Sequence, residues 1–237
     1  MKKKGKCASL KAILAWLDRE LDVKAFDDVS NNGLQIARDG DSVTSVAFAV
    51  DGSLASVEKA AELGAQLLVV HHGISWGGGI RRIVDGEYAI VKAAIGANLA
   101  LAGYHLPLDA NKKHGNNWEL ARFFGLKRIE PAFSYHGNVI GVTGFNKHGK
   151  KIGVCSGGAG EFSLEAKRLG CDLYVTGEAS WGEKIAAENV GMPMLCGGHY
   201  ETETFGVRAL SRAIAKAFPV GVHFISRDQS VCSERTA

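Results

Sequence analysis

The chain has 237 residues, of which 46% are hydrophobic and 22% charged, ordinary values for a globular protein. This composition excludes a disordered chain, and the length allows a substantial core in one large domain or two small lobes. The formal net charge is +3 with acids and bases interspersed, so we expect no nucleic-acid-binding face.

The first half of the chain predicts alternating strands and helices. The basic run MKKKGK at 1–6 is expected to be a solvated terminus. Ser9 is a predicted helix cap, because apolar residues recur on one face at Leu10, Ile13, Leu14, Leu17 and Leu21. The next predicted elements are a strand at 42–51, a helix at 53–64, a strand at 65–72, a Gly-rich loop at 75–82, a helix at 87–97 and a strand at 98–105.

The second half continues the alternation. Its predicted elements are a helix near 116–125, strands at 138–145 and 151–157, a helix at 162–169, a strand at 171–177, a helix at 183–191, a strand at 192–199, a helix at 204–218 and a strand at 221–226. This order predicts an α/β fold with largely parallel sheets flanked by helices. Ligands of such sheets bind beyond the carboxyl ends of the strands.

The two halves resemble each other in the placement of a His four residues before an acid. The pairs are His105 with Asp109 and His199 with Glu203, each after a short apolar run. We therefore predict two similar lobes, residues 1–125 and 126–237, that form one compact unit in which the lobes can share strands. A pseudo-twofold relation would bring the ligand-type side chains to loops around one cleft between the lobes.

The residue types in this pattern favour a metal site. Imidazoles with carboxylates suit Zn, Fe, Mn, Co or Ni, and the lack of nearby cysteines argues against a closed structural zinc site. The neighbouring His71 and His72 alternate faces on a regular strand, but at a strand end they can reach two different metals. A carboxylate can bridge two cations about 3.5–4 Å apart.

Cysteine usage and hydropathy bear on the compartment. The five cysteines are odd in number and lack CxxC spacing, so we expect reduced thiols and a cytoplasmic location. Cys155, Cys171 and Cys196 lie in apolar runs and are expected to be buried. No stretch approaches the roughly 20 apolar residues that cross a bilayer, and charges at 18–20 are wrong for a signal-peptide core.

Several motifs together resemble the dinuclear-metal family called NIF-three-like, or GTP cyclohydrolase type 2-like. They are SNNGLQ from residue 30, LLVVHHG, YHLPLDANKKHGNN, VTGEAS and GGHYETE, in the family's order over nearly the whole chain. The resemblance implies the short form of the family, two divalent metals between two α/β lobes, and a ring of six chains. It also implies that His72 and Asp109 bind one metal, His71 and His199 the other, and that Glu203 bridges both.

Some positions depart from the family pattern or have more than one interpretation. Gly73 and Leu106 replace a usual Pro and Thr, and Ser180 and Trp181 stand where many members have a His, so the substrate pocket is expected to differ. His105 and Glu178 are either groups that orient ligands or acid/base catalysts, and we keep both as candidate catalytic residues.

Three further segments lie near these motifs. In the loop at 75–82, Trp76, Arg81 and Arg82 suit a nucleotide's base and phosphates, although a mobile loop is an equal alternative. The segment at 31–35 is either a capped turn lining the cleft or only a turn. The glycine run at 156–160 is interpreted as a strand-to-helix turn.

Three functions remain open from the sequence. The first is a metal-dependent hydrolase acting on a nucleotide or related small molecule. The second is a carrier that delivers metal, for example iron, without turnover. The third is a ring-forming interaction protein with structural metals. The family resemblance implies a homo-oligomer, and the charge and hydropathy of the chain lead us to expect neither nucleic-acid nor membrane partners.

Overall fold

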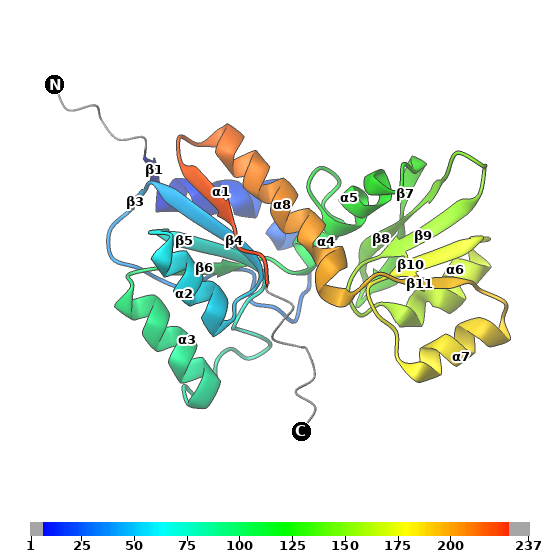
Figure 1. Cartoon of the computed structure of the whole chain (residues 1–237), viewed down its shortest axis with the longest axis horizontal. Helices are drawn as coiled ribbons and strands as arrows, with labels where there is room; N and C mark the ends of the chain where they lie inside the picture. The colour runs from blue at the N-terminus through cyan, green and yellow to red at the C-terminus, as the bar shows by residue number, and fades with distance from the viewer. Residues whose placement is uncertain (1–6, 228–237) are drawn as a thin grey trace.

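The computed structural model describes residues 7–227, which form two five-stranded sheets lying side by side (Figure 1). The first sheet has the order β12 (Gly221–Phe224), β4 (Ser45–Asp51), β5 (Leu67–His72), β6 (Ala100–Gly103) and β2 (Gly33–Ile36). The second has the order β11 (Met194–Cys196), β10 (Leu173–Thr176), β9 (Lys151–Cys155), β8 (Asn138–Phe145) and β7 (Lys127–Tyr135). A separate short pair joins β1 (Ala8–Ser9) to β3 (Ser42–Val43). The basic run at 1–6 and Cys232 lie outside the described residues.

Helices cover both sheets. They are α1 (Leu10–Glu20), α2 (Leu54–Glu62), α3 (Asp85–Gly96), α4 (Leu106–Ala110), α5 (Asn116–Phe123), α6 (Ser163–Arg168), α7 (Trp181–Asn189) and α8 (His199–Ala217). Ser9 caps α1 as predicted, because its side chain accepts a hydrogen bond from the Ala12 amide. Among the described helices, none is long and apolar enough to span a membrane.

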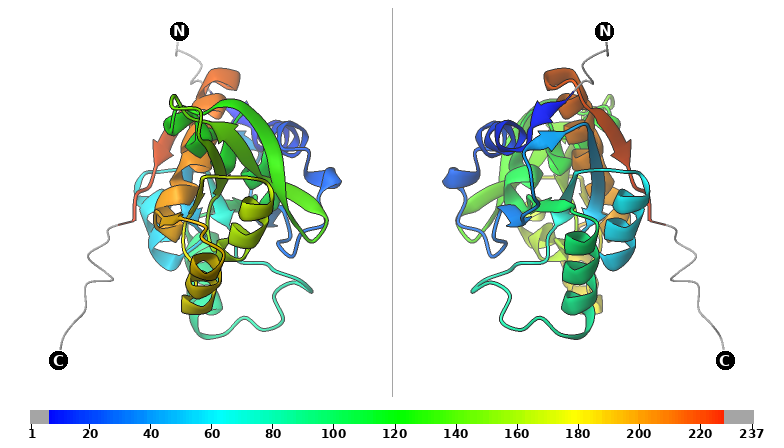
Figure 2. Two further views of the ribbon diagram at one scale, coloured as in Figure 1. Left: turned by 90° about the vertical axis from the view of Figure 1, so that its right-hand side faces the viewer. Right: turned by 90° about the vertical axis from the view of Figure 1, so that its left-hand side faces the viewer.

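The first sheet is buried on both faces. Strands β12, β4, β5 and β6 run parallel, and β2 pairs antiparallel with β6. Val46 and Phe48 of β4 pack with α1 and α8, whereas the alternating Ala47 and Ala49 pack with α2 and α3. Figure 2 shows α1 and α2 on opposite sides of this sheet.

The second sheet is mixed. Strands β9, β10 and β11 are parallel, whereas β8 pairs antiparallel with β9 and with β7. Residues of α6 and α7 pack on one face, around Phe133 and Tyr174. Trp118 of α5 packs on the other face, against Val142 and Val154. The predicted α/β architecture, with parallel strands and helices on both sides, is confirmed.

The C-terminal segment connects the two sheets. The N-terminal part of α8 lies beside the second sheet, and the helix then runs across the first, as Figure 1 shows in orange. Its apolar stripe at Val207, Leu210 and Ile214 belongs to the core of the first sheet. Strand β12 then pairs with β4, so the last part of the predicted lobe 126–237 lies in the first sheet.

Some local predictions were wrong. Strands β2 and β7 and helix α4 were not predicted, and α8 begins at His199 instead of at residue 204. Strand β7 is an edge strand that contains Pro131 and a bulge, which weakens the alternating pattern. All four described cysteines are free, but Cys196 is exposed and not buried, because it lies on the edge strand β11.

Candidate metal centre

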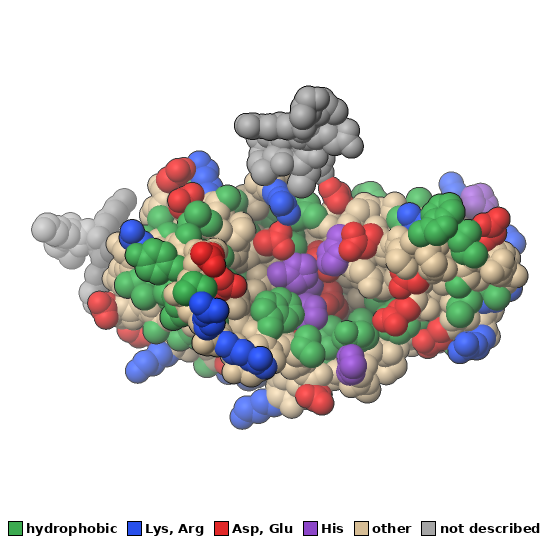
Figure 3. All heavy atoms as spheres, turned by 90° about the horizontal axis from the view of Figure 1, so that it is seen from below, with side chains coloured by type: hydrophobic (Ala, Val, Ile, Leu, Met, Phe, Trp, Pro, Cys, Tyr) green, Lys and Arg blue, Asp and Glu red, His purple; other side chains and the backbone are tan. Residues whose placement is uncertain are grey.

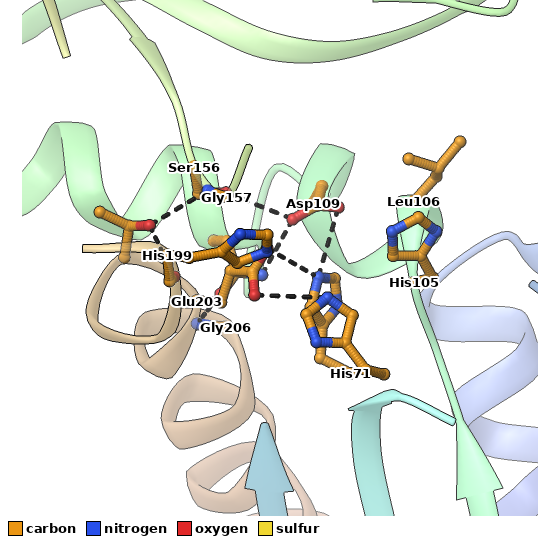
Figure 4. A network of polar contacts seen from close by, with 12 residues as sticks. His71, His105, Leu106, Asp109, Ser156, Gly157, His199, Glu203 and Gly206 are labelled. Atoms are coloured by element: carbon orange, nitrogen blue, oxygen red, sulfur yellow. Dashed lines mark hydrogen bonds and ion pairs between the residues drawn. The ribbon is translucent and has the colours of Figure 1, made fainter. Parts of the chain in front are cut away.

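The predicted ligand residues come together where strand ends of both sheets meet. His71 and His72 end β5, Asp109 lies on α4 just after β6, and His199 and Glu203 lie on the first turns of α8 (Figure 4). On the side of the second sheet, the segments that follow β9, β10 and β11 border the same place. This is the carboxyl end of the parallel strands, as expected.

Glu203 is the centre of the cluster. Its Oε1 lies 3.5 Å from Nε2 of His71 and 3.2 Å from Nε2 of His199, and its Oε2 lies 3.4 Å from Nε2 of His72. The carboxylate is buried, with a residue exposure of 4%. One buried carboxylate therefore faces three imidazoles, a group of side chains that could hold a metal ion.

Asp109 faces His71 and is fixed from the other side. Its Oδ2 lies 3.6 Å from Nε2 of His71. Its Oδ1 accepts hydrogen bonds from the side chains of Asn116 at 2.9 Å and Ser156 at 3.3 Å. Asn116 is itself fixed, because its side-chain oxygen accepts from the Gly206 amide of α8. One carboxylate oxygen is thus held in place, and the other is directed at the cluster.

Each of the four histidines makes a hydrogen bond through Nδ1. The acceptors are Tyr104 O for His71 at 3.0 Å, Asp51 for His72, Asp28 for His105 and Glu178 for His199, the last three at 2.9 Å. A carbonyl or an ionised carboxylate can only accept, so Nδ1 carries the proton in each ring. The Nε2 lone pair of a neutral ring is then free to bind a cation, as in most protein metal sites.

The close packing of these groups also shifts the pKa values of His71, His199 and Glu203. Burial disfavours the charged form of His71, but the carboxylates of Asp109 and Glu203 outweigh it and raise the pKa of His71 to about 10. The hydrogen bond to Glu203, opposed by burial, raises the pKa of His199 to about 9. Burial raises the pKa of Glu203, but the neighbouring imidazoles exceed this effect and hold it well below its usual range. In the absence of metal, protons on the imidazoles balance the buried carboxylates.

Hydrogen bonds within the cluster do not satisfy all of its buried polar atoms. Nε2 of His71 and Oε2 of Glu203 are buried and have no hydrogen-bond partner among the described residues. Buried polar atoms without partners are rare, because each costs about 1–3 kcal/mol. A cation between imidazole nitrogens and carboxylate oxygens would satisfy both, and ligand atoms of His72, His199 and Glu203 already lie within 4.8 Å of one another. The residues present therefore fit divalent metal ions.

The local structure differs from the predicted loops. His105 is the residue that precedes α4, and Asp109 lies on that helix; His199 and Glu203 are separated by one turn of α8. For His199 and Glu203 the four-residue spacing is therefore helical and places both side chains on one face, whereas His105 lies outside α4. Gly198, with φ of +92°, separates β11 from α8 and allows the helix to begin directly at His199.

The candidate catalytic residues have distinct surroundings. His105 lies beside the cluster, with its ring centroid 5.2 Å from that of His71 and 5.8 Å from that of His72. Its ligand atom and those of His71 and His72 lie within 4.8 Å of one another. Glu178 is exposed and contacts His199 through the hydrogen bond to Nδ1.

The sequence analysis missed several supporting residues. Asp28, Asp51 and Asn116 hold His105, His72 and Asp109, respectively. Asp51 ends the predicted strand next to β5, and Asn116 lies within the motif HGNN, so both positions had a signal in the sequence. Asp28 had none, because nothing in its local sequence relates it to a residue far along the chain.

The segment at 31–35 also supports the site. The side chain of Asn32 accepts a hydrogen bond from the His105 amide, and Gln35 accepts from the amides of Ile74 and Ser75. Its residues are not among those that line the cavity at the cluster, and from Gly33 the segment forms strand β2, so its contribution is these backbone contacts. It fixes the backbone on either side of the histidine cluster.

The glycine run at 156–160 is more than a turn. Gly157, with φ of +69°, follows β9 directly beneath Glu203, and a Cβ there would lie 2.3 Å from Glu203 Oε1. Only glycine allows the backbone to come this close. Ser156, Gly158 and Ala159 line a cavity of about 260 Å³ that opens from the cluster. Figure 3 shows the histidines gathered in this hollow, beside hydrophobic side chains.

Comparisons with known proteins identify the family of the chain. The sequence model of the Duf34/NIF3 family (NGG1p interacting factor 3) matches residues 8–143 and 134–230. Two proteins named GTP cyclohydrolase 1 type 2 homolog, from Pyrococcus horikoshii and Deinococcus radiodurans, are each 35% identical over 90% of this chain, covering 96% and 91% of their own lengths. The crystal structure of TTHA1606 from Thermus thermophilus has a TM-score of 0.81 and 27% identity, over 93% of this chain and 99% of that one. The chain belongs to the Duf34/NIF3 family.

Proposed function

We propose that the chain binds two divalent metal ions at this cluster. His71 and Asp109 would hold one, His72 and His199 the other, and Glu203 would bridge them. The carboxylate of Glu203 among three imidazole Nε2 atoms is the observation that carries this proposal. The assignment exchanges the two neighbouring histidines relative to the one implied by the family resemblance, because His71 is the one that faces Asp109.

We further propose that the bound metals serve hydrolysis of a nucleotide or related small molecule. Two divalent cations supply a Lewis acid for the scissile group and lower the pKa of water. His105 has Nε2 available at the edge of the cluster, and its Nδ1–H is fixed by Asp28. His105 would be the residue that exchanges a proton with the substrate. Glu178 would be a positioning residue for His199. The names of the relatives, GTP cyclohydrolase 1 type 2 homolog, support this class of reaction.

Product release from a panel of nucleotides by metal-loaded protein tests this function. We expect turnover that is abolished in His71→Ala and Glu203→Ala and strongly reduced in His105→Ala, with the last variant retaining its metals. Equal rates in the parent and the Glu203→Ala variant would contradict the hydrolase.

A metal carrier is the second candidate, and one observation favours it. The side chains of His199 and Glu178 are 37% and 63% exposed, so one side of the cluster is open to an acceptor. Rapid metal transfer to an acceptor, without product from any nucleotide, would support the carrier.

We also infer a homo-oligomer of six chains, located in the cytoplasm, that binds neither nucleic acid nor membranes. The family membership supports the ring, and the free thiols support the compartment. Light scattering of the purified protein tests the number of chains.

A further inference from the structure

The cavity beside the cluster has a mixed lining. One set of residues comprises the imidazoles and carboxylates of the candidate metal centre. The other set is apolar and consists of Trp76, Leu106, Tyr135, Ile140, Ala159 and Phe162. A ligand here would meet the metal centre with one part and apolar or aromatic walls with the rest.

Trp76 is held rigidly in this lining. Its Nε1–H donates to the Gly73 carbonyl at 2.9 Å, and its ring stands 5.1 Å from the His105 ring at an interplanar angle of 75°. Backbone hydrogen bonds from Asn31 to Ser75 and from Gly77 to Val29 hold this stretch of the loop on both sides. The indole is nevertheless 37% exposed. A fixed, partly exposed indole that lines a cavity is suited to stacking against a planar ring.

The charges around the cavity disfavour a polyphosphate. Asp109, Glu161 and Glu203 line it, and no Lys or Arg is among the described lining residues. Arg81 and Arg82 are exposed and lie outside the lining. Two divalent cations would exceed these three carboxylates by one positive charge, which is little for a triphosphate. Phosphate sites usually contain Arg, Lys or backbone amide donors.

The volume of the cavity also disfavours a polyphosphate. At about 260 Å³, the cavity lies below the roughly 300–1,000 Å³ typical of sites for drug-sized ligands. It therefore suits one ring system with a small substituent better than a complete nucleoside triphosphate.

Glu161 supplies the remaining polar contact. Its carboxylate lines the cavity and makes no hydrogen bond or ion pair within residues 7–227. An ionised carboxylate is an acceptor with two oxygens, which matches two neighbouring N–H donors on the edge of a heterocycle.

We propose that this cavity binds a compact, planar heterocycle with N–H donors and without a triphosphate, stacked on Trp76 and hydrogen-bonded to Glu161. The inference rests on the proposed function and narrows its substrate class. It places a ring of the ligand at the metal centre and any phosphate outside the cavity.

Calorimetric titration of metal-loaded protein with guanosine, inosine and GTP tests the inference. Guanosine shares its base with GTP, whereas inosine lacks the 2-amino donor. We expect guanosine to bind at least as tightly as GTP, and inosine to bind less tightly than guanosine. Trp76→Ala should weaken guanosine binding about tenfold, and Trp76→Phe should largely retain it. Trp181→Ala, an exposed indole on α7, is the matched control and should change nothing.

Glu161→Gln should reduce the difference between guanosine and inosine, because the amide offers only one acceptor oxygen. Tighter binding of GTP than of guanosine, no guanosine binding at millimolar concentration, or equal affinities in the parent and Trp76→Ala would overturn the inference. These results are binding ratios, so they are independent of product release, and a protein that binds guanosine without hydrolysing any nucleotide would contradict only the hydrolase.

Discussion

The two ends of the histidine cluster differ in their surroundings although both face Glu203. At the inner end, His71 is fully buried and donates to a backbone carbonyl, and its partner Asp109 is held by Asn116. At the outer end, the side chain of His199 is 37% exposed, and its acceptor Glu178 is 63% exposed. The inner imidazole is fixed by the fold, whereas the outer one depends on a surface side chain.

This difference suggests unequal metal positions. An inner metal would bind to a preformed site, because its ligands cannot move without disturbing the core. An outer metal would be easier to exchange, since water reaches its ligands. The comparison therefore predicts one tightly bound and one weakly bound ion per chain.

Glu203→Gln should have the largest effect, because this carboxylate faces both proposed positions. We expect affinity for both ions to fall by more than the roughly 10–100-fold typical of changes around a metal ligand. Elemental analysis after dialysis gives the metal content per chain. Glu201→Gln, an exposed acid on the same turn of α8, is the control and should retain both ions. Two tightly bound ions in Glu203→Gln would be inconsistent with a bridging carboxylate.

Two single variants, each lacking the imidazole at one end of the cluster, distinguish the two proposed metal positions. His199→Ala should retain about one ion per chain, held by His71 and Asp109. His71→Ala should lose the inner ion and also lower thermal stability, because it removes the buried imidazole that faces both Asp109 and Glu203. Metal content and melting temperature measured on both variants check this asymmetry. Equal losses from the two variants would show that the ends are equivalent.

The pH dependence of the melting temperature of metal-free protein tests the balance between the imidazole and carboxylate charges of the cluster. The pKa values of His71 and His199 are raised to about 10 and 9 from 6.5, so their contribution to stability is complete below pH 6.5 and is lost as pH rises through 9–10. The pKa of Glu203 is lowered, so its contribution exists above about pH 4.5 and is lost on acidification. Chelated protein should therefore melt at the highest temperature between about pH 4.5 and 6.5, and at progressively lower temperatures up to pH 10.

Added metal should reverse this trend above pH 6.5, because metal binding requires neutral imidazoles and releases protons. Melting curves with and without chelator provide the measurement. A melting temperature of the chelated protein that rises from pH 6.5 to 10 would contradict the charge balance. An unchanged melting temperature on chelation would contradict metals whose only role is structural.

The smallest expected effects concern the Nδ1 acceptors. Asp51→Asn and Glu178→Gln should each weaken metal binding within the roughly 10–100-fold range seen for such partners. Glu178→Gln should lie at the lower end, because its carboxylate is the more exposed of the two. Competition with a chromophoric chelator measures both affinities, and Glu188→Gln on α7 is the matched control. A larger loss for Glu178→Gln than for Asp51→Asn would contradict the comparison.

Much of the fold could be predicted because the strands and helices have strong local patterns. The apolar strand before His71 and His72 and the amphipathic first helix both appear where expected. Strand β12 was predicted as an element, but its pairing with β4 was not, since sheet order depends on contacts distant in sequence. Strand β7 has no clear alternation, so its local sequence did not identify it.

The residues of the histidine cluster could be predicted from the sequence for a different reason. Its five proposed ligands lie in short motifs whose residue types suit metal binding, and they come together at strand ends. Which imidazole binds which metal stays a prediction: the family resemblance pairs His72 with Asp109, whereas the short distance between His71 and Asp109 favours His71. Asp28 was missed because it contacts His105 only through the folded chain.

Anomalous diffraction from crystals grown with added metal tests the central claim most directly. We predict two peaks in each chain, one between His71 and Asp109 and the other between His72 and His199, with Glu203 in contact with both. A single peak that Glu203 does not touch, or an empty cluster in metal-supplemented crystals, would contradict the account.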